Sequence, residues 1–212
     1  MARSYKVKEA FYTLQGEGAQ AGRAAVFLRF TGCNLWSGRE EDRHGAVCRF
    51  CDTDFVGTDG TNGGRYTQVQ CADLVEGLWP GGGTPYVVCT GGEPLLQLDA
   101  PLVAELRGRG FEVAVETNGT LPLPPGGVDW VCVSPKAAAG LALTTGDELK
   151  LVYPQAEAAA DPARFADLNF THFFLQPKDE AGADHKAATV AYCMTHPRWR
   201  VSLQTHKIMG IE

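Results

Sequence analysis

Short apolar runs recur along the chain, and stretches with helical spacing separate them. The runs are rich in β-branched and aromatic residues and do not alternate strictly between apolar and polar positions. Such runs are typical of strands that are buried on both faces of a parallel sheet. The predicted strands are Ala24–Phe30, Tyr86–Cys89, Phe111–Val115, Val128–Val133, Glu148–Val152, His172–Leu175 and Trp199–Leu203.

The stretches between these runs carry apolar side chains at the spacing of a helix. The predicted helices are the stripe Leu74, Val75, Leu78 and Trp79, the stripe Leu102, Val103 and Leu106 after the N-cap Asp99, and the segments Ala156–Leu168 and Ala187–His196. Alternating strands and helices form right-handed βαβ units. Because the helices are too few for eight repeats, we predict an α/β fold with an incomplete (shortened) parallel β/α barrel, in which residues 1–212 form one domain.

Nearly every predicted strand ends in a cluster of polar residues. In barrels and in open α/β sheets, active sites gather at the carboxyl ends of the strands. Clusters at several strand ends would therefore meet at one opening, which favours an enzyme over a structural module. The clusters are Thr31–Cys33, Thr90–Glu93, Glu116–Gly119, Ser134–Lys136, Gln176–Asp179 and Gln204–Lys207.

Three cysteines lie in the loop that follows the first of these strands. Cys48 and Cys51 form a C-x-x-C pair, and fourteen residues separate Cys33 from Cys48. Iron–sulfur clusters are held by thiolates, usually four for a cubane, so three would leave one iron open to a small chelating molecule. A structural zinc site with His44 as the fourth ligand explains the same pattern, as do three unrelated thiols. The loop alone favours the cluster and the zinc site equally.

The composition indicates a soluble chain in a reducing compartment. Hydrophobic residues make up 44% and charged residues 21%, and the net charge of −6 argues against a nucleic-acid partner. The N-terminus lacks the apolar core of a signal peptide, and no apolar run is long enough to span a membrane. Seven cysteines, an odd number, favour a cytoplasmic location and thiol chemistry. The four outside the loop, Cys71, Cys89, Cys132 and Cys193, are predicted to fill the core.

Taken together, the motifs resemble those of the radical S-adenosylmethionine (SAM) superfamily and, within it, the 7-carboxy-7-deazaguanine synthase family. They are Leu14–Gly18, Arg29–Cys33, Cys51–Thr53, Thr90–Pro94, Glu116–Gly119, Ser134–Lys136 and Gln204–Lys207. The resemblance implies a homodimeric lyase that converts 6-carboxy-5,6,7,8-tetrahydropterin to 7-carboxy-7-deazaguanine with loss of ammonia, on the way to queuosine and related deazapurines. One departure is the cluster loop, at about 32–54: the usual C-x3-C-x2-C spacing is expanded here by an insertion at 34–47.

The resemblance also assigns residues to the cofactors. Cys33, Cys48 and Cys51 would hold a 4Fe–4S cluster whose open iron binds SAM, and an electron donor such as a flavodoxin or ferredoxin would reduce it. We expect Glu93 at the methionine ammonium and Glu116 at the ribose; the alternative for both is a helix N-cap or an exposed loop acid. The predicted SAM-binding residues are Phe50, Gly91, Gly92, Glu93, Glu116, Ser134, Pro135, Lys136, Gln176, Pro177, Lys178 and Asp179.

The remaining motif residues are assigned to the pterin substrate. Glu17 can accept two hydrogen bonds from the amidine-like edge of a pterin, and Arg29 can bind its carboxylate. The alternatives are a surface salt bridge for Arg29 and a solvated tail for His206. Thr53 would hold Mg²⁺ against substrate oxygens, although its chemistry alone favours a turn in which it only caps the backbone. The predicted substrate contacts are Leu14, Gln15, Gly16, Glu17, Arg29, Thr90, His206 and Glu212, and the predicted catalytic residues are Cys33, Cys48, Cys51, Glu17 and Arg29.

Other classes of protein remain as alternatives. A glycyl-radical-enzyme activase of the same superfamily would need an open groove for a protein loop, and it would not explain the pterin-fitting segments Gln15–Glu17 and Gln204–Lys207. A non-enzymatic Cys3His zinc module would contain zinc and no acid-labile sulfide. A cluster protein that only carries electrons would not bind SAM.

Overall fold

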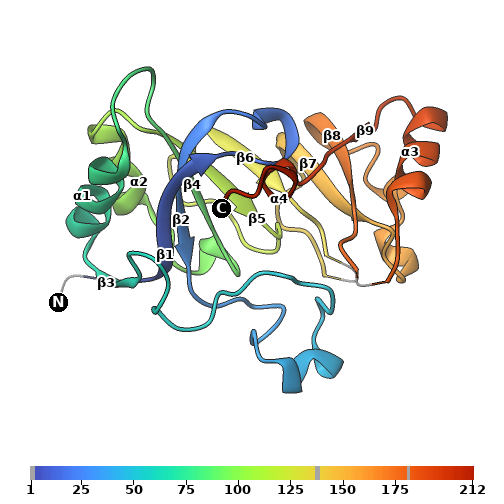
Figure 1. Cartoon of the computed structure of the whole chain (residues 1–212), viewed down its shortest axis with the longest axis horizontal. Helices are drawn as coiled ribbons and strands as arrows, with labels where there is room; N and C mark the ends of the chain where they lie inside the picture. Colours follow the sequence, from blue (N-terminus) through green and yellow to red (C-terminus); the bar gives the residue numbers. More distant parts are fainter. Residues whose placement is uncertain (1–2, 137–138, 181) are drawn as a thin grey trace.

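The computed structural model describes residues 3–136, 139–180 and 182–212, and its main feature is one large sheet (Figure 1). Within these residues nine strands pair in the order β3-β1-β2-β4-β5-β6-β7-β8-β9, and the two edge strands do not meet. β1 is antiparallel to β2 and β3, whereas all pairings from β2 to β9 are parallel. The strands are β1 (Tyr5–Leu14), β2 (Ala24–Phe30), β3 (Gly64–Tyr66), β4 (Tyr86–Gly91), β5 (Glu112–Thr117), β6 (Trp130–Val133), β7 (Thr145–Tyr153), β8 (Asn169–Pro177) and β9 (Arg200–Val201).

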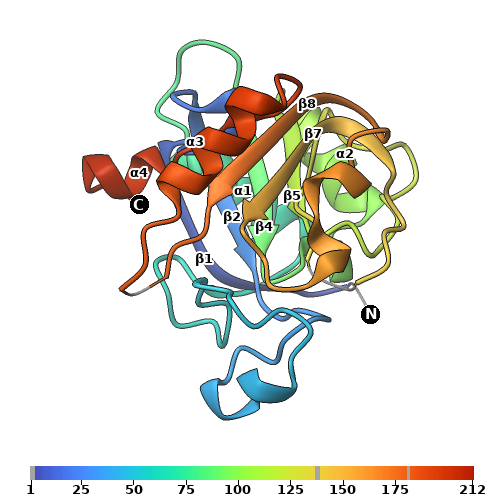
Figure 2. The same cartoon turned by 90° about the vertical axis from the view of Figure 1, so that its right-hand side faces the viewer.

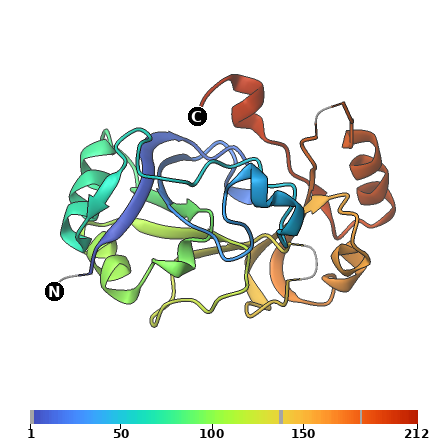
Figure 3. The same ribbon diagram turned by 90° about the horizontal axis from the view of Figure 1, so that it is seen from below.

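Helices cover one face of the sheet at its two ends (Figures 1 and 2). α1 (Gln68–Leu78) and α2 (Ala100–Gly108) pack together against β1, β2 and β5, and α3 (Lys186–Thr195) packs against β8 and β9. The short α4 (Thr205–Met209) stands away from the sheet beside the C-terminus (Figure 3). Short 3-10 helices are Gly18–Gln20, Glu40–Gly45, Pro94–Leu96, Ala158–Ala160 and Pro162–Arg164. Among the described residues, no helix combines the length and the apolar character that crossing a membrane requires.

The parallel strands bury alternate side chains against the helices. On β2, Val26, Leu28 and Phe30 belong to the main core, whereas Phe27 and Arg29 line a cavity on the opposite face. This alternation follows from the pleat, since successive side chains of a strand point to opposite faces. The core therefore lies on one face of the sheet, and the cavity lies on the other.

The predicted fold class is confirmed, because the sheet is mostly parallel and open as in an incomplete barrel. All seven predicted strands are present, and Ala24–Phe30 has the predicted bounds. The strands β1 and β3, which form one edge of the sheet, were not predicted. β1 carries Lys6, Lys8 and Glu9, so it did not resemble a run buried on both faces. α1, α2 and α3 correspond to three of the predicted helices.

The prediction of a helix over Ala156–Leu168 was wrong. This segment forms the two 3-10 helices Ala158–Ala160 and Pro162–Arg164 instead. Asp161 between them is extended, with φ of −60° and ψ of 127°. Proline lacks an N–H group and disfavours the helical conformation in the residue before it, so the helix cannot continue through this point.

The four cysteines outside the cluster loop lie where a core role predicts. Cys71, Cys89 and Cys132 are buried, and burial raises the pKa of each thiol. Cys193 is half-buried on α3. These thiols are packing side chains rather than ligands.

Candidate functional site

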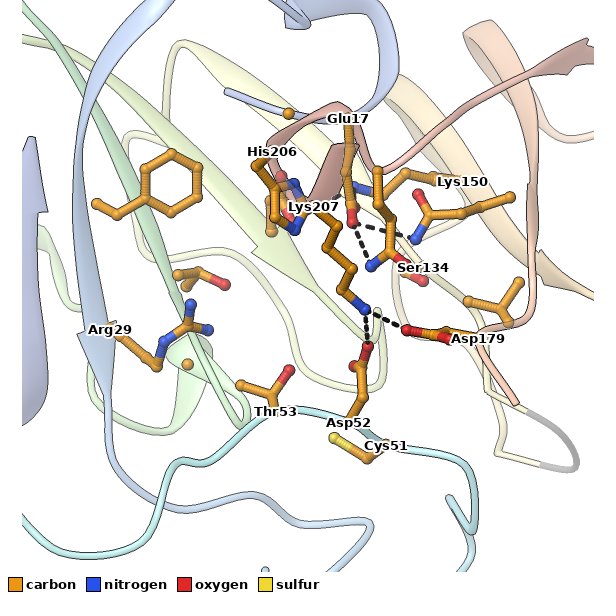
Figure 4. A pocket seen from close by; sticks show the side chains of 18 of the residues that line it. Glu17, Arg29, Cys51, Asp52, Thr53, Ser134, Lys150, Asp179, His206 and Lys207 are labelled. Carbon is orange, nitrogen blue, oxygen red and sulfur yellow. Dashed lines mark hydrogen bonds and ion pairs between the residues drawn. The ribbon is translucent and has the colours of Figure 1, made fainter. Parts of the chain in front are cut away.

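A cavity of about 460 Å³ opens where the carboxyl ends of the parallel strands meet (Figure 4). Its wall combines the β1–β2 loop, the ends of the central strands, the loop after Cys51 and the C-terminal segment. The predicted site residues that line it are Leu14, Gln15, Gly16, Glu17, Arg29, Phe50, Cys51, Thr53, Thr90, Gly91, Gly92, Glu116, Ser134, Lys136, Gln176, Pro177, Lys178, Asp179, His206 and Glu212. Cys33, Cys48, Glu93 and Pro135 lie outside this lining.

Glu17 extends into the cavity from the β1–β2 loop and binds donors from several other elements. Lys150 Nζ lies 2.6 Å from its Oε2, and the side-chain amides of Gln176 and Gln204 donate to its Oε1 at 3.1 and 3.0 Å. Burial raises the pKa of Glu17, but the charge and hydrogen bond of Lys150 outweigh it and lower that pKa to about 2. A carboxylate offers about four acceptor positions, of which protein donors occupy three. This leaves about one for a substrate, where the sequence analysis expected two.

Lys150 of β7 is the main site residue that the sequence analysis missed. Its side chain is only 5% exposed and forms ion pairs with Glu17 and, at 3.4 Å, with Glu116 Oε2. Burial lowers the pKa of a lysine, but the acidic groups around Lys150 raise its pKa well above the usual value. The signal in the sequence was a lysine between Leu149 and Leu151 in an apolar run. A charge that is buried there needs a partner.

The β1–β2 loop is hydrogen-bonded to the C-terminal segment. The backbone N–H and the hydroxyl of Thr205 both donate to the Gly16 carbonyl at 2.9 Å. The His206 ring lies against Gly16, where a Cβ atom would overlap it. The Thr13 hydroxyl donates to the backbone oxygen of Glu212 at 2.7 Å. His206 and Glu212 are thus part of the cavity wall, and the alternative of a solvated tail does not describe His206.

Arg29 points into the cavity from β2 (Figure 4). Its Nε lies 2.7 Å from Glu9 Oε1 on the neighbouring strand β1. Both side chains are largely buried, at 19% and 26% exposure, so this ion pair is part of the cavity wall rather than of the outer surface. Glu9 fixes a guanidinium whose planar fork of donors suits a carboxylate.

Glu93 does not reach the cavity. It is fully buried, and its carboxylate accepts hydrogen bonds from the Leu95 N–H, the Thr117 hydroxyl and the Asn118 N–H at 2.8 to 2.9 Å. The first of these bonds makes Glu93 the N-cap of the 3-10 helix Pro94–Leu96. Glu93 therefore has the N-cap role that was the alternative for it, and its contact with the methionine ammonium stays a prediction.

The cluster loop approaches the end of β4 closely. A Cβ atom on Gly91 would overlap the Phe30 carbonyl, and one on Gly92 would overlap the Gly32 carbonyl and the Cys33 side chain. The Gly91 φ of 154° also lies in the region that favours glycine. Only glycines allow this approach, which brings Cys33 beside the cavity wall.

Of the three loop cysteines, Cys51 has the donor chemistry that an iron–sulfur cluster needs, whereas burial raises the pKa of Cys33 and the hydrogen bond to Cys51 raises the pKa of Cys48. The Cys48 thiol donates to the Cys51 sulfur and lowers the pKa of Cys51 to about 6. A thiolate is the form that binds iron, so this hydrogen bond favours the ligand form of Cys51. Cys33 lies on the other side, against Gly92, and its sulfur accepts the Leu35 N–H at 3.4 Å. Cys51 lines the cavity, and Cys33 lies against Gly92, which also lines it, so these two thiols are next to the cavity.

The zinc alternative has less support from the geometry. His44 is exposed, and its Nδ1 lies 3.0 Å from the Glu41 carbonyl of its own 3-10 helix. No group of three or more His, Cys, Asp or Glu side chains forms a metal-binding arrangement in the described parts of the chain. Because this finding covers the three thiols as well, it does not separate zinc from a cluster; the zinc alternative loses support because His44 is exposed and bonded within its own 3-10 helix.

Lys207 of α4 crosses the mouth of the cavity (Figure 4). Its Nζ lies 2.8 Å from Asp52 in the cluster loop and 2.6 Å from Asp179 after β8. Thr53, the candidate Mg²⁺ ligand, lines the cavity next to Asp52. Lys207 belongs to one of the predicted strand-end clusters, but no role was predicted for it. This bridge holds the C-terminal segment over the proposed cofactor residues.

Comparisons with known proteins agree with this architecture. Residues 43–142 match the Radical SAM superfamily. The chain is 61% identical to the 7-carboxy-7-deazaguanine synthase of Caulobacter vibrioides and to that of Bordetella pertussis, over 98% of this chain and 99% of each relative. It is 35% identical to that of Synechocystis sp., over 98% of this chain and 94% of the relative. The crystal structure of QueE from Escherichia coli superposes with a TM-score of 0.69 at 25% identity, over 94% of this chain and 93% of that one.

Proposed function

Because the chain belongs to the 7-carboxy-7-deazaguanine synthase family of radical SAM enzymes, we propose that its cavity converts 6-carboxy-5,6,7,8-tetrahydropterin to 7-carboxy-7-deazaguanine with loss of ammonia. The protein is a lyase of queuosine biosynthesis. One observation carries the proposal: apart from Glu93 and Pro135, the residues that the motifs assign to SAM and those assigned to the pterin line a single cavity. Positioning two reactants in one enclosure can lower a barrier by about 7–11 kcal/mol.

The cofactor side of the cavity lies against the cluster loop. A 4Fe–4S cluster with SAM bound to it would supply the radical that starts the reaction. Cys33, Cys48 and Cys51 would hold the cluster, and the backbone of Gly91 and Gly92 would face the methionine portion. The nucleoside portion would extend along the strand ends, with the Glu116 carboxylate at the ribose hydroxyls.

The pterin side lies between the β1–β2 loop and β2. Arg29, held by Glu9, would bind the substrate carboxylate. Glu17 would accept one hydrogen bond from the amidine-like edge, because Lys150, Gln176 and Gln204 occupy its other positions. These contacts orient the ring, and the C-terminal segment above them would exclude water.

Three finer features complete the proposal. Thr53 would hold Mg²⁺ together with substrate oxygens, since Mg²⁺ prefers oxygen ligands and retains waters. A flavodoxin-like or ferredoxin-like protein would deliver the electron. The enzyme would be a homodimer, for which the exposed apolar side chains Met194, Ile208 and Met209 provide surface. Sedimentation tests the dimer, and turnover with and without Mg²⁺ after chelation tests the metal.

The decisive experiment is turnover by the protein reconstituted anaerobically with iron and sulfide. With SAM and a chemical reductant, the carboxypterin should yield 7-carboxy-7-deazaguanine, detected by mass spectrometry. A brown protein whose reduced-cluster paramagnetic signal shifts with SAM but that leaves the pterin intact would contradict the substrate. A colourless zinc-loaded protein would contradict the radical chemistry as well.

A matched pair of cysteine variants sharpens this experiment. Cys51→Ala should abolish both the cluster signal and turnover, because it removes a ligand at the cavity wall. Cys193→Ala makes the same chemical change on α3, away from the cavity lining, and should retain both. Equal loss in the two variants would mean that the effect is one of folding and not of ligation.

A further inference from the structure

A buried lysine joins carboxylates that belong to two different parts of the site. Lys150 Nζ lies 2.6 Å from Glu17 Oε2 and 3.4 Å from Glu116 Oε2. The lysine comes from β7, Glu17 from the β1–β2 loop and Glu116 from β5, so three separate elements meet at this point. In Figure 4 the Lys150 side chain extends toward Glu17 at the back of the cavity.

The network continues on both sides of the lysine. The Gln15 side-chain amide donates to Glu116 Oε1 at 2.7 Å, so the β1–β2 loop also contacts Glu116 directly. Glu148, two residues before Lys150, accepts the Ala19 N–H of the same loop at 2.6 Å. Loop and strand ends are therefore connected by charged and polar side chains rather than by a backbone ladder.

The charges explain why this arrangement depends on the lysine. Glu17 faces Lys150 and His206, while Lys150 faces Glu17, Glu116, Glu148 and the Cys132 thiol. Without the ammonium group, several acidic side chains would share a site with little water. Like charges at such distances disfavour ionisation, so one carboxylate would bind a proton or turn away.

We propose that Lys150 is a positioning residue for the reaction: it holds the Glu17 and Glu116 carboxylates in one network, so that the pterin subsite and the SAM nucleoside subsite are organised together. This inference rests on the proposed function, from which it takes the two subsites. Its consequence is that a change at Lys150 weakens the binding of two different molecules. A lysine that only stabilised the fold would not have this effect.

The test compares Lys150→Met with Lys150→Arg in the cluster-loaded enzyme. For Lys150→Met we expect the Kd for SAM and the KM for the carboxypterin each to rise about tenfold or more, the size of a lost hydrogen bond to a charged group. The KM should rise further as the pH is lowered from 8 to 6, because Glu17 then binds a proton. Lys150→Arg keeps the charge and should restore part of both affinities. SAM binding is measured by calorimetry, which needs no turnover.

Arg109→Met serves as the matched control. Arg109 pairs with Asp73, Glu76 and Glu105 on the helices, away from the cavity lining. Its loss removes a cation from a carboxylate cluster without touching the site. It should lower the urea midpoint and leave the Kd for SAM, the KM and the pH profile as in the wild type.

The outcomes separate this inference from the proposed function. A wild type that binds SAM but does not convert the pterin contradicts the function, while the Kd for SAM in Lys150→Met still tests the network. A Lys150→Met variant of normal Kd, KM and pH profile overturns the inference whatever its stability. If Lys150→Met does not fold, Glu17→Gln is compared with Glu17→Gln/Lys150→Met, in which Glu17 no longer leaves a carboxylate unpaired and only Glu116 loses its lysine partner. Equal SAM affinities in that pair would also overturn the inference, and weaker binding in the double variant supports it.

Discussion

Gly16 has no side chain, and the His206 ring occupies the space where one would be. The position of His206 in the cavity wall therefore depends on a missing methyl group in another part of the chain. This contact is specific to one residue pair, since the Thr205 hydrogen bonds to the Gly16 carbonyl would survive a small displacement. At the residue scale, the shape of the site depends on a glycine without a side chain as well as on charged side chains.

Gly16→Ala should displace the His206 ring and impair pterin binding. We expect kcat/KM for the pterin to fall about tenfold or more through KM, with the Kd for SAM unchanged, as for loss of a hydrogen bond to a charged group. Gly77→Ala is the matched control: Gly77 lies in α1, no atom lies within 4 Å of an added Cβ, and the change should stabilise the protein by about 0.5–1 kcal/mol. Kinetics and urea unfolding of both variants measure this. Normal kinetics in Gly16→Ala would show that His206 has no contact with the substrate.

Arg29→Met should affect the substrate and not the cofactor. The variant leaves Glu9 without its guanidinium partner and removes the donors that we assign to the pterin carboxylate. The KM for the pterin should rise about 10–100-fold, while the Kd for SAM stays constant. Arg107→Met, which breaks the outer pair with Asp129, is the control and should leave both values unchanged. A change in SAM affinity in Arg29→Met would place Arg29 at the cofactor instead.

Much of the site at this scale could be predicted because polar residues at strand ends are adjacent in sequence. Ser134 and Lys136, for example, belong to one short motif and both line the cavity. Lys150 could not be given a role in that way, because its partner Glu17 is 133 positions away. Glu93 has the motif position of a ligand but is the N-cap of a 3-10 helix. Local sequence does not show which of two possible hydrogen-bond partners a buried carboxylate will find.

Among the elements, α1 shows how a helix begins independently of the site. The Thr67 side chain accepts the Gln70 N–H, and the Gln70 side chain accepts the Thr67 N–H, which completes a capping box. Thr67→Ala should therefore lower the free energy of unfolding by about 1 kcal/mol without changing turnover. Urea unfolding and the pterin assay check this together. Altered kinetics would mean that α1 is coupled to the cavity.

Elements were predictable where a strand is buried on both faces and failed where other factors decide. β4 combines an uninterrupted apolar run with parallel neighbours, so its pattern alone indicates it. β1 is long but antiparallel and carries charges, and β3 has only three residues. In the segment that we predicted as one helix, Pro162 interrupts a composition that favours helix. An edge strand depends on its neighbours in the sheet, which the hydrophobic periodicity of its own sequence does not show. A single proline can end a helix even where the apolar residues keep a helical spacing.

At the scale of the whole molecule, side chains and the β1–β2 loop close the gap between the two ends of the open sheet. Near the β9 edge, the Ser202 hydroxyl accepts the Gly18 N–H at 2.9 Å, and Glu148 of β7 accepts the Ala19 N–H. A Cβ atom at Gly18 would overlap the Glu148 carboxylate. The barrel is thus completed by buried acids and a loop, which makes its stability depend on the protonation of those acids.

The stability of the protein should therefore pass through a maximum in mildly acidic solution. Burial raises the pKa of Glu93 and Glu148 above the usual 4.5, so the folded protein binds these protons at higher pH than the unfolded chain. As the pH falls from neutral toward about 4.5, these two groups increase the stability. Glu17 acts in the opposite direction: despite its burial, Lys150 lowers its pKa to about 2, so the unfolded chain is protonated first. Its contribution is fully present above about 4.5 and is lost as the pH falls toward 2.

Urea midpoints of the cluster-free, reduced protein between pH 7 and pH 3 measure this profile. Each group changes the free energy of unfolding by at most about 1.4 kcal/mol per pH unit. Glu148→Gln should flatten the rise on the neutral side, because it removes one group of raised pKa. Glu17→Gln should make the fall below about pH 4.5 shallower, and the exposed pairs such as Lys207 with Asp179 should contribute little to that fall. A Glu17→Gln profile parallel to the wild type in acid would show that Lys150 does not hold Glu17 as a buried carboxylate, and the closure of the sheet would then rest on the contacts of Glu148 and Ser202 with the β1–β2 loop.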